Sequence, residues 1–282
     1  MPVVHSASEL SRFLEKNTAN MPSVGFVPTM GALHQGHLSL MQQSLAENQI
    51  TVVSIFVNPT QFNNPEDLKK YPRTLESDVQ KIEALSRDII IFAPSVTEMY
   101  GHTLLSDAYY FDGLEHQMEG KFRPGHFDGV GTIVHKLFTM VQPNRAYFGE
   151  KDFQQLRIIQ TLVKNLGLPI QIVPCAIFRE PHGLAMSSRN ERLPQAVRAE
   201  AAFIYELLQT VAVLFPHQPF ETILADVVKT FENHEGFELE YFEICDELTL
   251  TPMDVFDKNK KYRAFIALHV SNVRLIDNIS LN

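Results

Sequence analysis

Cysteine is scarce in this 282-residue sequence, which contains only Cys175 and Cys245. Neither has a second thiol or a histidine at the spacing of metal ligands, which argues against a structural zinc site. Two isolated cysteines are also typical of a reducing compartment, where disulfides seldom form. We therefore expect both to be small residues of the core.

Long apolar runs and an excess of positive charge are also missing. No apolar run approaches the ~20 residues that a membrane helix needs, and the N-terminal residues lack the basic and apolar regions of a secretory signal. A net charge of -9 argues against a broad nucleic-acid surface, which needs clustered lysine and arginine. We therefore expect a cytoplasmic protein whose partners include neither a membrane nor a nucleic acid.

The sequence does contain a regular alternation of apolar strands and amphipathic helices. The β-branched run at 50–57 is too continuous for a half-exposed strand and indicates a parallel strand buried on both faces. The alternation predicts an α/β fold with a doubly wound, parallel, Rossmann-like sheet. Strands are expected at 24–27, 50–57, 88–93, 146–149 and 170–173, and helices at 6–16, 36–48, 74–85, 125–141 and 152–166.

The pattern changes past Asn190, where two helices precede alternating strands. The chain is longer than a usual single domain, so we expect a Rossmann-like domain at 1–182 and a smaller α+β lid domain at 183–282. The helices of the second domain are expected at 196–214 and 220–234, and its strands at 238–244 and 263–270.

A glycine-bearing turn follows the first strand, within residues 24–37. Gly31 and Gly36 let the backbone approach a ligand closely, and His34 and His37 lie three residues apart at the opening of a helix, where they share a face. Unpaired amides and a partial positive charge make a helix N-terminus attractive to phosphate. Taken alone, the stretch also fits an ordinary strand-to-helix loop with surface histidines.

A second group of polar residues follows the last strand of the first domain. The segment 183–190 reads Gly-Leu-Ala-Met-Ser-Ser-Arg-Asn, and its hydroxyls and guanidinium suit phosphate. Ligands of parallel sheets bind beyond the carboxyl ends of the strands. We therefore expect this segment, the 28–37 turn and the loops at 58–62 and 149–155 to converge on one crevice.

Together these motifs resemble the pantothenate synthetase family. The pairing of His-x-Gly-His with Met-Ser-Ser-Arg is similar to the signatures of the nucleotidyltransferase superfamily related to class I aminoacyl-tRNA synthetases. The resemblance spans nearly the whole chain and implies ATP-dependent condensation of (R)-pantoate with β-alanine to pantothenate, AMP and diphosphate, through a pantoyl adenylate. The segments that carry it are 28–37, 56–62, 123–130, 149–155, 183–190 and 274–278.

The resemblance also implies roles for individual residues around ATP. When a carboxylate approaches a polyanion, the site must position both and neutralise the charge that builds on the phosphoryl oxygens. His37 could also donate a proton, and the residues alone leave both roles open. The implied catalytic residues are His34, His37, Lys151 and Arg189. The implied ATP-binding residues are Met30, Gly31, Ala32, Leu33, His34, Gln35, Gly36, His37, Gly149, Glu150, Lys151, Asp152, Phe178, Met186, Ser187, Ser188 and Arg189.

Pantoate is implied to bind Gln61 and Gln155, because an amide supplies donors and acceptors without adding charge. Asn58, Arg123 and His126 complete the set for pantoate and β-alanine. Mg²⁺ is expected to accompany ATP, mainly through the nucleotide phosphates, and its protein ligands are not assigned. The family also implies a homodimer formed through the first domain.

Several residues keep a second interpretation. Asp152 with Gln155 could be a helix-capping pair, Lys151 could be a solvated surface lysine, and the ring of Phe178 at the end of the fifth strand could belong to the core. Asp78 is either a magnesium contact, as the family suggests, or a surface carboxylate on its helix.

Two residues depart from the family pattern. His182 stands where aspartate is usual and Ala176 where proline is common, and both could alter how the 183–190 loop closes.

Two other functions fit part of the pattern. A nucleotidyltransferase that stops at an adenylylated product would not release AMP in a substrate-dependent way. A catalytically silent nucleotide-binding or tRNA-binding protein would bind ATP without forming AMP, but the acidic charge and the set of histidines, lysine and glutamines favour the ligase.

Overall fold

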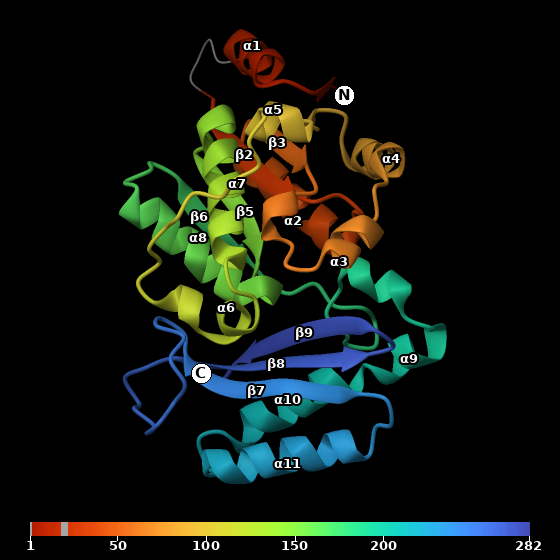
Figure 1. Cartoon of the computed structure of the whole chain (residues 1–282), viewed down its shortest axis with the longest axis vertical. Coiled ribbons are helices and arrows are strands. Elements are labelled where there is room, and N and C mark those ends of the chain that lie inside the picture. The colour runs from red at the N-terminus through yellow and green to blue at the C-terminus, as the bar shows by residue number, and fades with distance from the viewer. Residues whose placement is uncertain (1, 18–21) are drawn as a thin grey trace. The chain divides into compact units, whose positions relative to one another are not determined.

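The computed structural model describes residues 2–17 and 22–282 and divides into two compact units (Figure 1). The larger unit comprises Met1–Glu150 and Gln154–Cys175, and the smaller one Lys151–Phe153 and Ala176–Asn282. Within the described ranges, none of the helices combines the length and the apolar content that crossing a membrane requires.

A six-stranded sheet forms the centre of the larger unit, and all its strands pair in parallel. This confirms the predicted doubly wound α/β class. The strand order is β1 (Val3–Val4), β4 (Ile90–Phe92), β3 (Ile50–Ile55), β2 (Val24–Thr29), β5 (Arg145–Gly149) and β6 (Gln171–Cys175). The chain places β3 and β4 on one side of β2, and β5 and β6 on the other, so the strand order reverses between β2 and β5. Ligands of such sheets bind at this switch point, beyond the carboxyl ends of the strands.

Helices cover both faces of this sheet, which explains why neighbouring residues of the central strands are buried and mostly apolar. Val27 of β2 packs on one face with Met41 of α2 (Gln35–Glu47). Phe26 packs on the opposite face with Phe138 of α7 (His126–Val141), with ring centroids 6.2 Å apart. The other helices carried by the larger unit are α1 (Ala7–Asn17), α3 (Pro65–Lys70), α4 (Leu75–Leu85), α5 (Val96–Tyr100), α6 (Met118–Phe122) and most of α8 (Phe153–Asn165), with 3₁₀ turns at Pro59–Gln61 and Leu114–His116. A further 3₁₀ turn, Glu150–Asp152, has its first residue in the larger unit and its other two in the smaller one.

The smaller unit is a three-stranded antiparallel sheet with helices, as the α+β prediction requires. Helices α10 (Phe203–Leu214) and α11 (Phe220–Glu232) lie on the same side of the sheet (Figure 1), and their apolar residues share one core with the strands. The strands are β7 (Glu238–Asp246), β8 (Tyr262–Val270) and β9 (Val273–Ser280), in that order.

Some predicted elements need correction. The helix expected at 196–214 is two helices, α9 (Gln195–Glu200) and α10, separated by Ala201 and Ala202. Alanine is the strongest helix former, so the local sequence carries no signal for this break. Strand β9 was not predicted, and β6 ends at Cys175, before Phe178. Cys175 and Cys245 are both buried free thiols, which confirms their assignment to the core.

Acid is expected to destabilise the smaller unit through its carboxyl groups. Burial opposes the ionisation of Glu180 and Glu240, but hydrogen bonds from Arg198 and Arg274 outweigh it and lower the pKa of each carboxyl below 4.5. A lowered native pKa contributes stability above the ordinary value, and this contribution is lost as the pH falls through the native value. The free energy of unfolding should therefore decrease as the pH falls below the ordinary carboxyl value of 4.5 and through the lower native values.

Urea unfolding at a series of pH values measures this dependence. Glu180→Gln should lower the free energy of unfolding at neutral pH, and this loss should shrink as the pH falls through the lowered native pKa of Glu180 and the carboxyl takes up a proton. An effect of this substitution that is equal at both ends of the pH range would contradict the assignment.

Candidate active site

The turn between β2 and α2 is held in a left-handed conformation by a buried carboxylate. Gly31 and Ala32 have φ angles of 79° and 49°. Asp78 of α4 accepts hydrogen bonds from the backbone N–H groups of Ala32 (2.9 Å) and Leu33 (2.8 Å). A Cβ atom at position 31 would lie 3.0 Å from an oxygen of Asp78, so glycine fits here in space as well as in φ. Lys81, one turn further along α4, donates to the Leu33 carbonyl at 2.7 Å.

Asp78 is therefore not a surface carboxylate, and this interpretation was wrong. Its side chain is 0% exposed, because it packs under the turn that it binds. Both carboxylate oxygens accept backbone N–H groups. Sequence spacing could not reveal this, since Asp78 and Ala32 lie 46 residues apart.

Asp78→Asn should lower the free energy of unfolding by about 1–3 kcal/mol, because one buried N–H group of the turn would lose its acceptor. The Michaelis constant for ATP should rise as well, since the turn carries candidate phosphate-binding residues. Urea unfolding and steady-state kinetics measure the two effects. Glu76→Gln, at an exposed position two residues earlier in α4, is the matched control. Equal behaviour of the two variants would show that Asp78 does not support the turn.

The two histidines of the turn lie together at the beginning of α2. The rings of His34 and His37 are 4.0 Å apart between centroids. The backbone N–H of His34 donates to Nδ1 of His37 at 3.3 Å. A neutral imidazole that accepts at Nδ1 carries its proton on Nε2. The other nitrogen of His37 is thus a hydrogen-bond donor in both protonation states.

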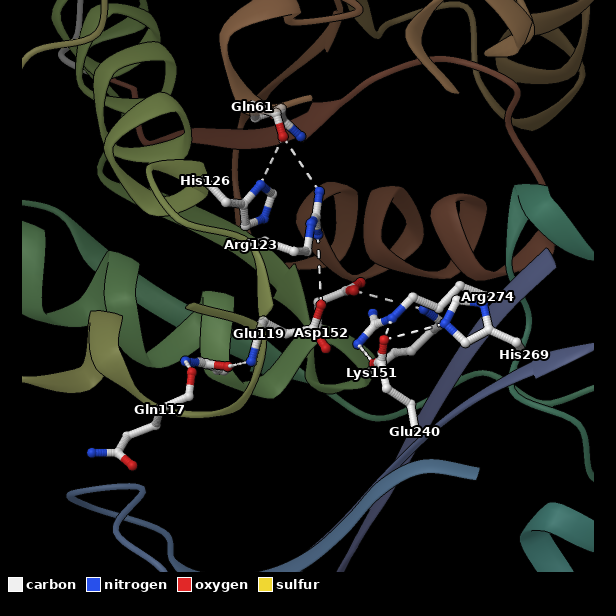
Figure 2. Close-up of polar contacts among 11 residues, drawn as sticks. Gln61, Gln117, Glu119, Arg123, His126, Lys151, Asp152, Glu240, His269 and Arg274 are labelled. Carbon is white, nitrogen blue, oxygen red and sulfur yellow. Dashed lines mark hydrogen bonds and ion pairs between the residues drawn. The ribbon is translucent and has the colours of Figure 1, made fainter. Parts of the chain in front are cut away.

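A second group of candidate residues meets around Gln61 (Figure 2). The Gln61 carbonyl accepts a hydrogen bond from Nδ1 of His126 at 2.8 Å and one from Arg123 at 3.3 Å. Because a carbonyl can only accept, Nδ1 of His126 carries a proton. The amide nitrogen of the Gln61 side chain donates to the thioether of Met30 at 3.2 Å. Sulfur is a weak acceptor, so this amide can turn to a stronger one.

Asn58 supports this group through its side-chain hydrogen bonds. Its amide nitrogen donates to Oε1 of Gln61 and to the Gly129 carbonyl, both at 3.1 Å. Its oxygen accepts from the hydroxyls of Tyr100 (2.6 Å) and Thr60 (3.1 Å). Burial raises the pKa of Tyr100, which keeps its hydroxyl a donor. The side chain of Asn58 is therefore fully occupied with holding the loop, and Asn58 is 1% exposed.

The two adjacent glutamines of α8 differ in their surroundings. Gln154 is buried, accepts from the Glu119 N–H at 2.9 Å and donates to the carbonyls of Leu114 and Gln117 just before α6. It thereby anchors α6, whose Glu119 lies 3.6 Å from Arg123. Gln155 is half-buried in the first turn of α8.

In the smaller unit, the 183–190 segment is fixed by backbone and side-chain contacts. The Met186 N–H donates to the Phe178 carbonyl at 2.9 Å, so the backbone of Phe178 pairs with the loop. The ring of Phe178 is not part of the core, because the residue is 41% exposed. The hydroxyl of Ser187 accepts from the Arg189 N–H at 3.3 Å. The buried carboxylate of Glu180 binds Asn190 at 2.8 Å.

His182 is accommodated beside this segment. Its Nε2 lies 3.0 Å from the Arg198 carbonyl, to which it donates, and 3.7 Å from Glu180. Lys151, which also belongs to the smaller unit, lies 3.6 Å from the half-exposed carboxylate of Asp152. Among the residues described, no three His, Cys, Asp or Glu side chains gather as a metal site would require.

The structure thus groups the candidate residues unit by unit. In the larger unit, the loops after β2, β3 and β5 leave the same edge of the sheet, as predicted. Among the supporting residues, Asp78 was singled out with the wrong role, and Lys81 and Gln154 were missed, although Gln154 lies inside the 149–155 motif.

Comparison with known proteins gives consistent matches along the whole chain. A model of the pantoate-beta-alanine ligase family matches residues 2–280. The pantothenate synthetase of Flavobacterium psychrophilum is 58% identical over 281 residues, with 100% of both chains covered. That of Christiangramia forsetii is 51% identical over 282 residues, also with full coverage of both.

Solved structures agree with these matches. A pantothenate synthetase from Thermus thermophilus is 38% identical, with a TM-score of 0.90 and coverage of 100% of this chain and 99% of that one. The pantoate-beta-alanine ligase of Francisella tularensis, solved with beta-gamma ATP and beta-alanine, is 35% identical, with a TM-score of 0.81 and coverage of 100% and 98%.

Proposed function

This chain belongs to the pantoate–β-alanine ligase family, and we propose that its reaction, the ATP-dependent joining of pantoate to β-alanine through a pantoyl adenylate, takes place on the candidate residues described above. The observation that supports this placement is the convergence of three residues on Gln61: Arg123 and His126 donate to its backbone carbonyl, and Asn58 donates to its side-chain oxygen. These residues come from two separate parts of the chain. Their meeting at the carboxyl edge of the sheet is the arrangement that a small acidic substrate needs.

In the first step, the pantoate carboxylate attacks the α-phosphorus of ATP. A new oxygen–phosphorus bond forms, the bond to the β-phosphate breaks, and diphosphate leaves with the electron pair. His34 and His37 bind the phosphates through their ring N–H groups, assisted by the beginning of α2. Lys151 and Arg189 neutralise the charge that builds on the phosphoryl and leaving oxygens. The adenosine part of ATP contacts the backbone near Phe178 and Met186.

The nucleotide-binding set completes this assignment. Backbone groups of the 28–37 turn and of the 149–155 loop approach the phosphates, and the hydroxyls of the 183–190 segment donate to them. The full proposed set is Met30, Gly31, Ala32, Leu33, His34, Gln35, Gly36, His37, Gly149, Glu150, Lys151, Asp152, Phe178, Met186, Ser187, Ser188 and Arg189.

Pantoate binds through amide groups. Gln61 exchanges its weak contact with the Met30 sulfur for the carboxylate or a hydroxyl of pantoate. Gln155 supplies the second amide. Arg123 and His126 face the same place and favour a negatively charged guest. Asn58 acts through Gln61, because its own donors and acceptors are engaged within the protein.

In the second step, the neutral amine of β-alanine attacks the carbonyl carbon of the adenylate. The carbon–nitrogen bond forms, AMP leaves with the electron pair, and the amine loses a proton. Water would compete for the same carbonyl, so the site must exclude it. Residues 183–282 provide this protection as a lid domain, and residues 1–182 bind ATP and pantoate.

ATP enters as its magnesium complex. The residues present do not form a protein-built magnesium site, because Asp78 is engaged by backbone N–H groups and no acidic cluster occurs among the described residues. The phosphate oxygens and water would hold the ion. We also propose that the protein works in the cytoplasm, where ATP is supplied, and as a homodimer, which sedimentation would test.

The deciding experiment is the formation of AMP from ATP and Mg²⁺ with pantoate and β-alanine together, and with each omitted. AMP that appears in equal amount with pantothenate, and only when both acids are present, is the expected result. AMP or diphosphate formed with neither acid would contradict the substrate assignment, and ATP binding without any AMP would indicate a silent nucleotide-binding protein.

A further inference from the structure

The motif near the end of the chain, residues 274–278, has no part in the reaction described so far. Its last two residues are neighbours on β9, and side chains of neighbouring strand residues leave opposite faces of a sheet. Asp277 is 4% exposed and Asn278 is 2% exposed. A buried carboxylate and a buried amide require hydrogen-bond partners. Their partners therefore show what this strand holds in place.

Asn278 holds the segment that carries Lys151. The side-chain nitrogen of Asn278 donates to the backbone carbonyl of Lys151 at 2.9 Å, and its oxygen accepts from Arg263 at 2.6 Å. The guanidinium of Arg263 lies over the ring of Phe153, 3.9 Å from its centroid. The segment 151–153 is thus fixed at Lys151 by the hydrogen bond from Asn278 and at Phe153 by the contact of its ring with Arg263.

Asp277 holds the other phosphate-binding segment of the same unit. It binds Arg179 through two parallel hydrogen bonds of 2.6 and 3.0 Å. Arg179 in turn donates to the carbonyl of Gly183 at 3.1 Å, at the first residue of the 183–190 segment. Two adjacent residues of β9 therefore fix both Lys151 and the loop that carries Arg189.

The geometry points to Asn278 as a positioning residue of the ligase reaction, which orients Lys151 towards the phosphates by holding its backbone carbonyl. This inference rests on the proposed function, because Asn278 is assigned no contact with substrate and acts only through Lys151. A misplacement of about 1 Å can cost about 10²-fold in rate. If the Asn278 amide were only structural, its loss would lower the stability and reduce the rates of both chemical steps by the same factor.

Asn278→Asp separates these roles. The variant keeps the size of the side chain and the acceptor for Arg263, but replaces the donor to the Lys151 carbonyl by a charged acceptor. Pantoate-dependent release of diphosphate should slow by about 10- to 100-fold. The reaction of supplied pantoyl adenylate with β-alanine should stay near the wild-type rate. Asn233→Asp is the matched control, because this exposed amide also donates to a backbone carbonyl.

A double-mutant comparison identifies the route of the effect. In a Lys151→Ala background, Asn278→Asp should cause no further loss in the first step. Independent, multiplying losses would overturn the inference, and so would an unchanged first step in Asn278→Asp alone. If Lys151→Ala itself had no effect, the role of Lys151 would fall and the inference with it, while the AMP assay would still decide the ligase activity. Asn278→Ser makes the same comparison if the aspartate variant does not fold.

Discussion

Lys151→Ala is expected to slow pantoate-dependent release of diphosphate by about 10³-fold, because a preorganised charge at a phosphoryl-transfer site contributes mainly to the transition state. The fold should survive, since the ammonium group pairs at 3.6 Å with a half-exposed carboxylate, and an ion pair that water reaches on one side contributes little stability. The loss should fall on the first chemical step. Quenched-flow measurement of diphosphate measures that step directly.

The second step provides the internal control for Lys151→Ala. No triphosphate is present when pantoyl adenylate and β-alanine are supplied, so this half-reaction should keep most of its rate. Lys164→Ala, which removes an exposed lysine near the other end of α8, should leave both steps unchanged. Diphosphate release at the wild-type rate in Lys151→Ala would refute the assignment of Lys151.

The layers of the fold could be predicted because their signals are local. The run at 50–57 is mostly apolar and has no alternation of exposed polar residues, since β3 is covered on both faces, and this pattern is visible within the strand itself. Strand β9 was missed because its inward positions include the polar Asp277, whose burial depends on Arg179, 98 residues away. The break between α9 and α10 was missed because alanine favours a continuous helix.

The candidate site shows the same division between local and distant information. The histidines of the β2–α2 turn were found from their spacing at the beginning of a helix. The residues that hold the site were not, because their partners are distant in sequence. Asp78 reaches a backbone N–H group 46 residues away, and Asn278 reaches a carbonyl 127 residues away. A hydrogen bond to backbone places no demand on the identity of the residue that it holds, so neither contact leaves a pattern in the sequence.

His37→Ala should slow the first step by about 10²- to 10³-fold, the usual cost of removing one donor aimed at developing negative charge. The structure favours a donor role, because the N–H of His34 binds Nδ1 of His37 and leaves the proton on Nε2. His37→Gln keeps an uncharged N–H donor. Its first step should therefore be about tenfold faster than that of His37→Ala, in line with the modest strength of a neutral hydrogen bond.

The pH dependence of the two variants distinguishes charge stabilisation from proton transfer at His37. A glutamine cannot transfer a proton near neutral pH, so recovery in His37→Gln means that donation of a hydrogen bond is enough. A different result would instead assign proton transfer to His37: His37→Gln is no faster than His37→Ala, and both variants lack an ionisation near neutral pH that the wild-type rate profile contains. His116→Ala, at an exposed side chain of the larger unit, should leave the profile unchanged. The expected order of first-step rates is therefore wild type, then His37→Gln, then His37→Ala, because glutamine keeps an N–H donor without the position of the imidazole Nε2, and alanine has no donor at all.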